Sequence, residues 1–364
     1  MTDVWIEHAA IKSALGEGLE QNFDAMLAGR TAFSAPAHFD GRGRLLAVCH
    51  DLDQPGDQPT SPSRAETLLL RLRPQLPERL PERLYLATTV GAIDRLETAG
   101  ALKPGGTPPE TSRALLAGAR RIFAARQAWL VAAACSSGQY AITAATTAIR
   151  RGQCRDALVI GCDMASEFVT AGFASLGALT ATTPRPYSLD RDGMALGEAA
   201  AAVVLTSRPE HPRGRIAGWG ETGDAAHITA PDRSGAWLAK AGKAALAGHI
   251  PAAVIGHGTG TVYNDEAELN ALATLFPDAA LPPLFSLKAN IGHTLGATGV
   301  VQAIIATVAL QRRQLPPQAG LTTPDPRAAG AVSTAPAALR RGGVLSLNAG
   351  FGGINHALLI AEAP

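Results

Sequence analysis

The stretch VAAACSSGQYAITAATTAIRRG, residues 131–152, decides how the rest of the sequence is interpreted. The apolar run AWLVAAA (128–134) predicts a buried strand, and the composition after it predicts a helix that continues to Arg151. Cys135 therefore lies at a strand-to-helix junction. Free backbone N–H groups and the helix dipole favour a thiolate there, so we expect its pKa to lie below the usual value of about 8.5. Most cysteines are buried and inert, but this position predicts a nucleophile.

The composition is typical of a folded protein of the reducing cytoplasm. The chain has 364 residues, 46% of them hydrophobic, and its net charge of +1 gives no general attraction to nucleic acid or an anionic membrane. The N-terminus lacks the pattern of an export signal, and the apolar segment 296–310 is shorter than the about 20 residues of a membrane span. No CxxC pair occurs, which argues against a zinc ribbon or a disulfide framework. The four cysteines are Cys49, Cys135, Cys154 and Cys162.

Short β-rich runs alternate with helical stretches along the chain, and this alternation predicts an α/β fold. Segments rich in proline and glycine, at 51–63, 101–112 and 321–337, predict surface loops. The predicted strands are 84–90, 128–134, 156–162, 201–206, 252–257, 283–288 and 343–349.

A break at SRPEHPRGR (207–215) divides the chain before a further run, RIAGWGE. We expect two α/β halves to join there, residues 1–208 with the nucleophilic cysteine and residues 209–364. Each half contains a strand, a turn of small residues with a reactive group, and a helix rich in alanine and glycine. This pattern predicts a duplicated fold.

Two histidines lie in turns of small residues in the second half. His257 follows a predicted strand in GHGTGTVYNDEAE (256–268), and His293 follows another in SLKANIGHTLGATG (286–299). Strand ends in α/β sheets face a common crevice, and the neighbouring glycines let backbone approach a ligand closely. We therefore expect both imidazoles to meet Cys135, although a single histidine in a turn is more often a surface or capping residue.

Four other features of the sequence add candidate roles near the predicted site. Asp265 and Glu268 stand where a capping box would, which is the slightly preferred interpretation. Lys288 either pairs with Glu268 and orients the site or is a solvated lysine at a strand end. Phe351, between glycines in NAGFGGINHA, predicts a tight turn that presents an aromatic ring and a backbone N–H. Segment 185–201 predicts a structural turn held by ion pairs.

Together these segments resemble the elongating β-ketoacyl-acyl carrier protein synthases of fatty-acid and type II polyketide biosynthesis. The resemblance covers most of the chain from about residue 130 onward and is carried by five ordered motifs. These are ACSSG, RDG…GEAA, HGTGT…ND-x-x-E, S-x-K-x-x-x-GH-x-x-GA-x-G and NAGFGGINH. It implies the thiolase fold, in which two similar α/β halves form five αβαβα layers, and a dimer.

The resemblance also implies a decarboxylative condensation. Cys135 would take the acyl group from an acyl carrier protein, with the N–H groups of Cys135 and Phe351 as the oxyanion hole. His257 and His293, both neutral, would donate hydrogen bonds to the enolate formed from malonyl-acyl carrier protein. No metal or organic cofactor would be needed, since the substrates are carried on phosphopantetheine.

Further roles follow from the same resemblance. Lys288 and Glu268, with Asp265, would brace the histidines, and Phe351 would gate the entry of the second substrate. The residues implied to contact the substrate arm are Thr259, Thr261, Gly350 and Gly352. The partner would be an identical subunit or a second ketosynthase-like chain.

Departures from the family pattern favour a compact, specialised enzyme of polyketide or aryl-polyene type. The interval before Cys135 is short, Ser188 and Met194 replace Asp and Phe, and GEAAA replaces GEGA. The alternative is a non-condensing subunit resembling a chain-length factor, although such subunits usually lack the cysteine. A biosynthetic thiolase would have a second cysteine near the C-terminus, and an ester hydrolase would have G-x-S-x-G.

Overall fold

The computed structural model describes residues 2–53, 62–98, 110–277 and 280–363. Within these ranges an 11-stranded sheet contains two groups of five strands, and a short strand, β2 (Gly16–Glu17), pairs with β1. The first group has the order β6-β5-β7-β8-β1. Its strands are β1 (Trp5–Ser13), β5 (Arg83–Ala87), β6 (Gln127–Val131), β7 (Asp156–Asp163) and β8 (Ala199–Thr206).

The second group repeats the pairing scheme of the first. In each group the outer three strands run parallel, and the remaining two continue the sheet in antiparallel fashion. Its order is β11-β10-β14-β15-β9. The strands are β9 (Gly214–Gly223), β10 (Ala253–Ile255), β11 (Leu284–Phe285), β14 (Gly343–Gly350) and β15 (Ile354–Glu362). The groups join where Trp5 and Ile6 of β1 pair with Arg215 and Gly214 of β9.

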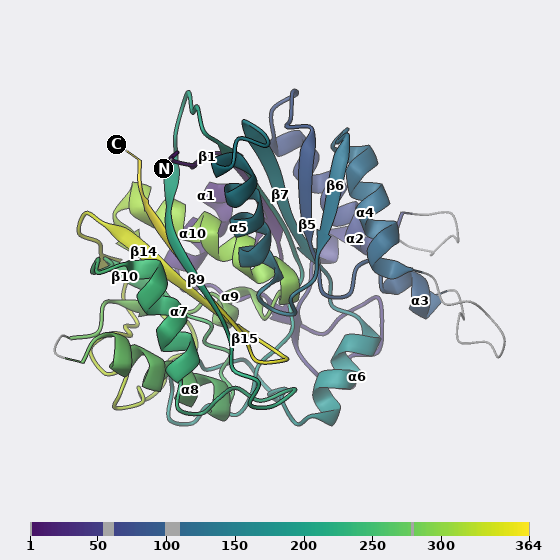
Figure 1. The fold of residues 1–364 in the computed structure, drawn as a ribbon. Helices are drawn as coiled ribbons and strands as arrows, with labels where there is room; N and C mark the ends of the chain where they lie inside the picture. Colours follow the sequence, from purple (N-terminus) through teal and green to yellow (C-terminus); the bar gives the residue numbers. More distant parts are fainter. Residues whose placement is uncertain (1, 54–61, 99–109, 278–279, 364) are drawn as a thin grey trace.

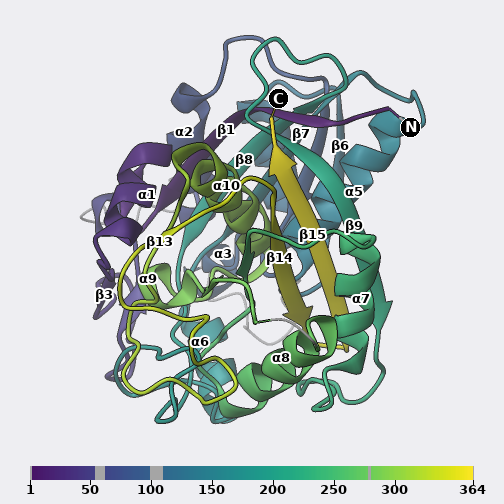
Figure 2. The ribbon, with the colours of Figure 1, turned by 90° about the vertical axis from the view of Figure 1, so that its left-hand side faces the viewer.

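Helices cover both outer faces of the two groups and fill the space between them (Figures 1 and 2). α5 (Ser137–Arg150) and α10 (Thr298–Arg312) lie in the middle, within a core drawn from both groups. α2 (Arg64–Leu72) and α4 (Thr111–Ile122) cover the first group. α7 (Ala236–Leu246) and α8 (Val262–Leu275) cover the second. This arrangement confirms the predicted α/β fold with five αβαβα layers.

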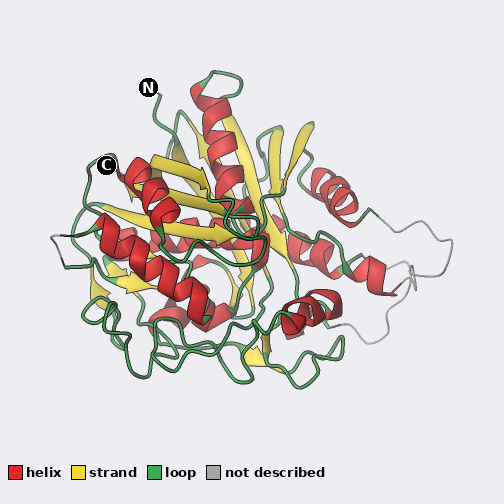
Figure 3. Cartoon of the chain, turned by 60° about the horizontal axis from the view of Figure 1, so that its bottom comes forward, coloured by secondary structure: helices red, strands yellow, loops and turns green. Residues whose placement is uncertain are grey.

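The remaining elements are short and lie mainly in the connections, which Figure 3 shows as green loops. The helices are α1 (Leu19–Leu27), α3 (Asp94–Thr98), α6 (Glu167–Ser175) and α9 (Lys288–Ile291). The 3₁₀ turns are His50–Leu52, Arg73–Gln75 and Leu295–Ala297. The small strand pairs are β3 (Phe33–Ser34) with β4 (Leu46–Ala47), and β12 (Gln314–Leu315) with β13 (Ala337–Ala338).

The two central helices touch backbone to backbone where they begin. A Cβ atom added to Gly138 of α5 would lie 2.7 Å from the Val300 nitrogen of α10. A Cβ added to Gly299 would lie 2.4 Å from the Gln139 nitrogen. Only glycine permits so close an approach. This contact brings the start of α5, next to Cys135, against the start of α10.

All seven predicted strands are present, with shifted ends. The run 283–288 forms only two residues of strand, and Lys288 begins α9 instead. The segment Leu295–Arg312 has the length and hydropathy of a membrane span, but 89% of it is buried inside the protein. This confirms the predicted buried helix. The loops at 51–63 and 101–112 lie mostly outside the described residues. The division at 208 and 209 falls between β8 and β9 and stays a proposal.

Candidate active site

Cys135 lies in a tight turn between β6 and α5. Ala134, just before it, has a φ of 48°, a left-handed conformation that is uncommon for a residue with a side chain. Ser137 holds the turn, because its hydroxyl accepts from the Ala133 N–H (2.8 Å) and donates to the Ala134 carbonyl (2.6 Å). The cysteine is buried and stands two residues before α5 begins. The predicted strand-to-helix junction is therefore confirmed.

The predicted low pKa of this thiol is wrong. The pKa of Cys135 is raised to about 11, mainly by burial and to a smaller extent by the negative charge of Asp163. Lys288 and the backbone N–H groups of Cys135 and Phe351 lower the pKa, but they do not offset the burial. The resting thiol is therefore protonated near neutral pH. The same two N–H groups are those expected to form the oxyanion hole.

His293 reaches Cys135 from the second strand group. Its Nε2 lies 3.0 Å from the Cys135 Sγ. On the other side of the ring the Leu295 N–H donates to Nδ1 (3.3 Å), and the Thr298 hydroxyl lies 3.2 Å from the same nitrogen. Since Nδ1 accepts a hydrogen bond, the ring proton resides on Nε2 and points toward the sulfur. Burial and then Lys288 lower the pKa of His293 well below its usual value, which keeps the ring neutral.

His257 stands beside His293, with the ring centroids 5.4 Å apart and the ring planes perpendicular. Its Nδ1 lies 3.1 Å from the Asn348 Oδ1 and 3.4 Å from the Lys288 Nζ. Lys288 Nζ also donates to the His257 carbonyl. Burial lowers the pKa of His257, and so do the positive charge of Lys288 and the neighbouring His293. Both imidazoles are thus neutral, as the expected hydrogen-bonding role requires.

Glu268 holds the backbone of the His257 turn. Its two oxygens accept hydrogen bonds from the N–H groups of His257 (2.5 Å) and Gly258 (2.7 Å) and from the Tyr187 hydroxyl (2.9 Å). Burial raises the pKa of Glu268. Burial lowers the pKa of Lys288, and the negative charge of Glu268 partly offsets this lowering. Lys288 contacts His257 directly. Its interaction with Glu268 is electrostatic, since the described residues Lys288 and Glu268 form no direct ion pair.

The capping-box interpretation of Asp265 and Glu268 is wrong. α8 begins after Thr261, whose side chain makes no capping bond, so both acids lie inside the helix. The Asp265 carboxylate turns back and accepts from the N–H groups of Thr259 (2.9 Å) and Gly260 (3.2 Å). The two carboxylates therefore fix the turn that carries His257, instead of capping α8.

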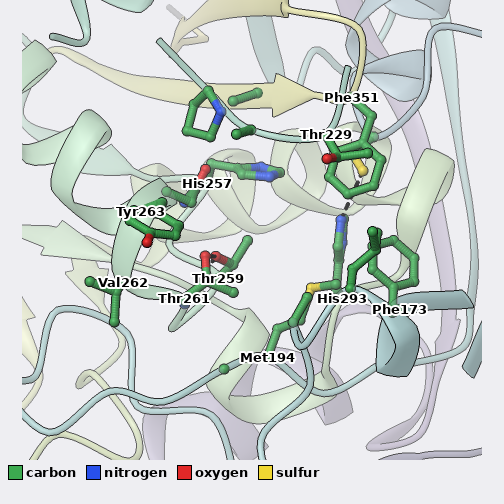
Figure 4. Close-up of a pocket in the computed structure, with 18 of the residues that line it drawn as sticks. Phe173, Met194, Thr229, His257, Thr259, Thr261, Val262, Tyr263, His293 and Phe351 are labelled. Atoms are coloured by element: carbon green, nitrogen blue, oxygen red, sulfur yellow. Dashed lines mark hydrogen bonds between the residues drawn. The ribbon is translucent and has the colours of Figure 1, made fainter. Parts of the chain in front are cut away.

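The thiol and the two imidazoles open onto one cavity of about 360 Å³. Figure 4 shows His257 and His293 facing this space, with Phe351 and Phe173 near its edge. Phe351 is 36% exposed, and its ring centroid lies 5.5 Å from that of Phe173 in α6. The predicted site residues that line the cavity are Cys135, His257, His293, Thr259, Thr261, Gly350 and Phe351.

Four predicted residues lie outside this lining. Lys288, Glu268 and Asp265 stand behind the His257 turn, and the Gly352 N–H donates to the Ile228 carbonyl (2.7 Å). Among the described residues no cluster of histidine, cysteine and acidic side chains could hold a metal ion. Of the other cysteines, Cys49 and Cys162 are buried elsewhere and Cys154 is half-buried.

Sequence reasoning assigned segment 185–201 a structural role only. Its ion pairs are present, since Arg185 contacts Asp190 and Asp192. However, Asp192 and Met194 also line the cavity. The replacement of Phe by Met at position 194 was a usable signal for this wall.

Side chains that hold the histidines were also missed. Asn348 and Thr298 contact the imidazole nitrogens directly, and Gln302 contacts Asn348. Asn348 lies in the NAGFGG motif and Thr298 in the GATG turn, so proximity to recognised motifs was their only signal in the sequence.

Comparison with known proteins gives family and sequence matches over more than half of the chain. Residues 127–211 match the family model described as beta-ketoacyl synthase, N-terminal domain, and residues 213–322 match its C-terminal domain. The 3-oxoacyl-(acyl-carrier-protein) synthase 2 of Rhizobium meliloti is 36% identical over 256 residues, or 63% of this chain and 59% of that protein. The synthase 2 of Staphylococcus aureus is 35% identical over 53% of this chain and 52% of that protein. The matches thus span between half and three fifths of these relatives.

Two solved structures cover the whole chain and are covered by it. A β-ketoacyl synthase from Burkholderia phymatum superposes with a TM-score of 0.87 and 26% identity. The ishigamide ketosynthase/chain length factor superposes with a TM-score of 0.86 and 25% identity.

Proposed function

We propose that this chain, which belongs to the β-ketoacyl synthase family, condenses an acyl group held on Cys135 with the malonyl group of malonyl-acyl carrier protein. The observation that carries the proposal is the distance of 3.0 Å between Cys135 Sγ and His293 Nε2, in a cavity that His257 also lines. A nucleophile and a preorganised donor at one cavity are what the reaction needs.

In the first step, Cys135 Sγ attacks the carbonyl carbon of an acyl thioester on the carrier protein. The new S–C bond forms, the bond to the carrier sulfur breaks, and the thiol proton leaves with the carrier thiol. The developing oxyanion accepts hydrogen bonds from the N–H groups of Cys135 and Phe351, the two groups that already act on the sulfur. The acyl group is then held on Cys135.

In the second step, the malonyl group loses its carboxylate as carbon dioxide, and the electron pair of the broken C–C bond forms an enolate. The Nε2–H of His293 donates to the enolate oxygen. A neutral ring suits this role, because it donates a hydrogen bond without a positive charge, which would stabilise the enolate so strongly that it reacts more slowly.

In the third step, the enolate carbon attacks the acyl carbon on Cys135. A C–C bond forms, the S–C bond breaks, and the thiolate that leaves takes a proton from solvent. The raised pKa of Cys135, about 11, favours this proton uptake and resets the thiol.

The substrate arm would enter past Thr259 and Thr261, which line the cavity with their hydroxyls 2.8 Å apart. Phe351 would gate this entry with Phe173, and Gly350 and Gly352 would give Phe351 its freedom to move. Lys288, Glu268 and Asp265 would brace the histidines. The substrates would be held on phosphopantetheine, with no metal or organic cofactor of the protein itself.

We propose that the chain works in the cytoplasm with an acyl carrier protein and a second ketosynthase-like subunit. β6 supports the second partner, because in the described sheet it pairs only with β5. It also exposes Trp129 (38%) and Leu130 (39%) on neighbouring positions, so both faces of this edge strand are open. The partner is an identical chain or a chain-length factor, as in the ketosynthase pair that this fold matches.

A non-condensing subunit is the second candidate. The fold match to a ketosynthase/chain length factor pair is consistent with this role and with the condensing role. Cys135, His257 and His293 together favour the condensing role. The test incubates the purified chain, alone and with candidate partner subunits, with acyl-acyl carrier protein. Mass spectrometry should find the acyl group on Cys135 and none on the Cys135→Ala variant. No acylation under either condition would remove the condensing role.

A further inference from the structure

We propose that Gln302 is a positioning residue that fixes the tautomer of His257 through Asn348. In this arrangement the proton of His257 lies on Nδ1, and Nε2 presents a lone pair to the cavity. The two imidazoles then offer unlike atoms to the substrate, an acceptor at His257 and a donor at His293. This inference rests on the proposed function only for its kinetic consequence, because the tautomer itself is a property of the free protein.

The side-chain amide of Gln302 has one permitted orientation. Gln302 is fully buried in α10, and its Nε2 donates to the carbonyls of Gly256 (2.9 Å) and Leu347 (3.4 Å). Turning the amide over would place its oxygen against both carbonyl oxygens. Since buried polar groups need partners, that orientation is strongly disfavoured. The Gln302 Oε1 therefore faces the opposite side.

A second contact reinforces this orientation. The Ser346 hydroxyl donates to the Gln302 Oε1 (3.0 Å) and accepts from the Gln139 Nε2 (2.8 Å). The serine proton is thus committed to Gln302, because the serine oxygen already receives a hydrogen bond from α5. This relay joins α5, β14 and α10 at the point where the two central helices meet.

The orientation of Gln302 decides that of Asn348. The Asn348 Nδ2 donates to the Gln302 Oε1 at 2.7 Å, so the Asn348 Oδ1 faces the His257 Nδ1 at 3.1 Å. A reversed Asn348 would set two oxygens 2.7 Å apart. An amide oxygen can only accept, and therefore His257 must donate from Nδ1.

Lys288 is the one competitor for this nitrogen among the described contacts of His257. Its Nζ lies 3.4 Å from Nδ1, farther than the Asn348 oxygen, and it already donates to the His257 carbonyl. The Asn348 contact therefore sets the tautomer. This differs from the expectation that both imidazoles act as donors, because His293 alone has its Nδ1 occupied by a backbone N–H.

Nitrogen-15 NMR of the histidine rings tests the proposal without substrate. Long-range proton–nitrogen correlation spectra of ¹⁵N-histidine-labelled protein distinguish the two neutral tautomers, and the His257→Gln variant identifies the His257 signals. The unmodified protein should show the Nδ1–H form at His257 and the Nε2–H form at His293. An Nε2–H form at His257 would overturn the proposal.

Variants at position 302 test the role of the glutamine. Gln302→Met removes the acceptor for Asn348 and should shift His257 toward the Nε2–H form. Gln302→Glu, held protonated by its burial, donates its carboxyl proton to the Gly256 carbonyl in place of the amide and keeps an acceptor oxygen toward Asn348, so it should retain Nδ1–H. Thr307→Val, which removes another buried hydrogen bond in α10, should leave the tautomer unchanged. Retention of Nδ1–H in a folded Gln302→Met protein would overturn the role of Gln302. If Gln302→Met does not fold, Gln302→Glu decides the question. Loss of the Nδ1–H form in that variant would overturn the role of Gln302.

The kinetic arm uses malonyl decarboxylation. Gln302→Met should lower kcat about tenfold and leave KM within about twofold, because the tautomer affects the reacting atoms and not the binding of the carrier arm. Gln302→Glu should recover most of kcat. A rise in KM alone would contradict a positioning role. If Cys135 takes up no acyl group but the NMR result holds, the proposed function fails and this inference stands.

Discussion

His293 Nε2 lies 3.0 Å from Cys135 Sγ, although the two residues are 158 positions apart in the chain. The ring is held from behind, since the Leu295 N–H occupies Nδ1 and directs the remaining N–H at the sulfur. In the resting protein this N–H points at the nucleophile. In the proposed reaction the same N–H would donate to the enolate oxygen formed from the malonyl thioester.

Removal of this donor should abolish malonyl decarboxylation. His293→Ala is expected to lower the rate by about 10²–10³-fold, the usual effect of losing one preorganised donor. Release of labelled carbon dioxide from malonyl-acyl carrier protein measures it. His249→Ala, at an exposed histidine after α7, is the matched control and should keep the parent rate. A His293→Ala protein that decarboxylates at near the parent rate would show that the assigned role is wrong.

The raised pKa of Cys135 predicts a pH-dependent alkylation. Below a pKa of about 11 the thiolate fraction rises tenfold with each pH unit, and only the thiolate attacks iodoacetamide. The rate of modification should therefore increase steeply and steadily between pH 7 and pH 9. Peptide mass spectrometry follows the modification at Cys135 separately from Cys154, which is half-buried elsewhere. A rate that levels off below pH 8 would contradict the raised pKa.

The hydroxyls at the cavity wall predict a change in KM alone. Thr261→Val should raise KM for the carrier-bound substrate by about three- to tenfold, the effect of one lost hydrogen bond, and leave kcat near its parent value. Thr261 makes no capping bond to α8, so the helix should be unaffected. Thr274→Val, an exposed position in the same helix, is the control. Steady-state kinetics that show a fall in kcat alone would exclude the proposed contact.

The contact between the central helices predicts a large effect on stability. Gly138→Ala would place a Cβ 2.7 Å from the Val300 nitrogen and should destabilise the fold by about 1–3 kcal/mol. Gly172→Ala, in α6 with no atom within 4 Å of the added Cβ, should be neutral or stabilise by up to about 1 kcal/mol. Urea unfolding compares the two midpoints. Equal midpoints would mean that α5 and α10 can move apart without lowering the free energy of unfolding.

The sequence predicted that Cys135, His257 and His293 would meet at one cavity, because each of them lies in a short recognisable motif. Cys135 and His257 lie shortly after the strands β6 and β10, as predicted, whereas His293 follows the short helix α9 and not a strand. The groups that tune them were harder to predict. Asn348 and Gln302 meet only through the packing of β14 against α10, which no local pattern records. The sign of the Cys135 pKa shift was wrong for a related reason, because the helix start is a local feature and the burial is not.

One long strand, β1, was not predicted, and the reason is similar. β8 and β14 are apolar runs, and both were predicted. β1 has half-buried residues, Trp5, His8 and Ala9, irregularly placed among buried ones. It therefore shows neither clean alternation nor a continuous apolar run. Its neighbours on both sides, β8 and β9, determine its conformation.

The division of the site between the two strand groups has a consequence for protein synthesis. A ribosome completes α5 and its cysteine well before it makes α9 and α10. Until the later part is made and packs against α5, the sulfur has no imidazole beside it and no closed chamber around it. Under the proposed function, an incomplete chain would therefore be unable to capture a thioester, and the condensation would begin only once both strand groups have folded.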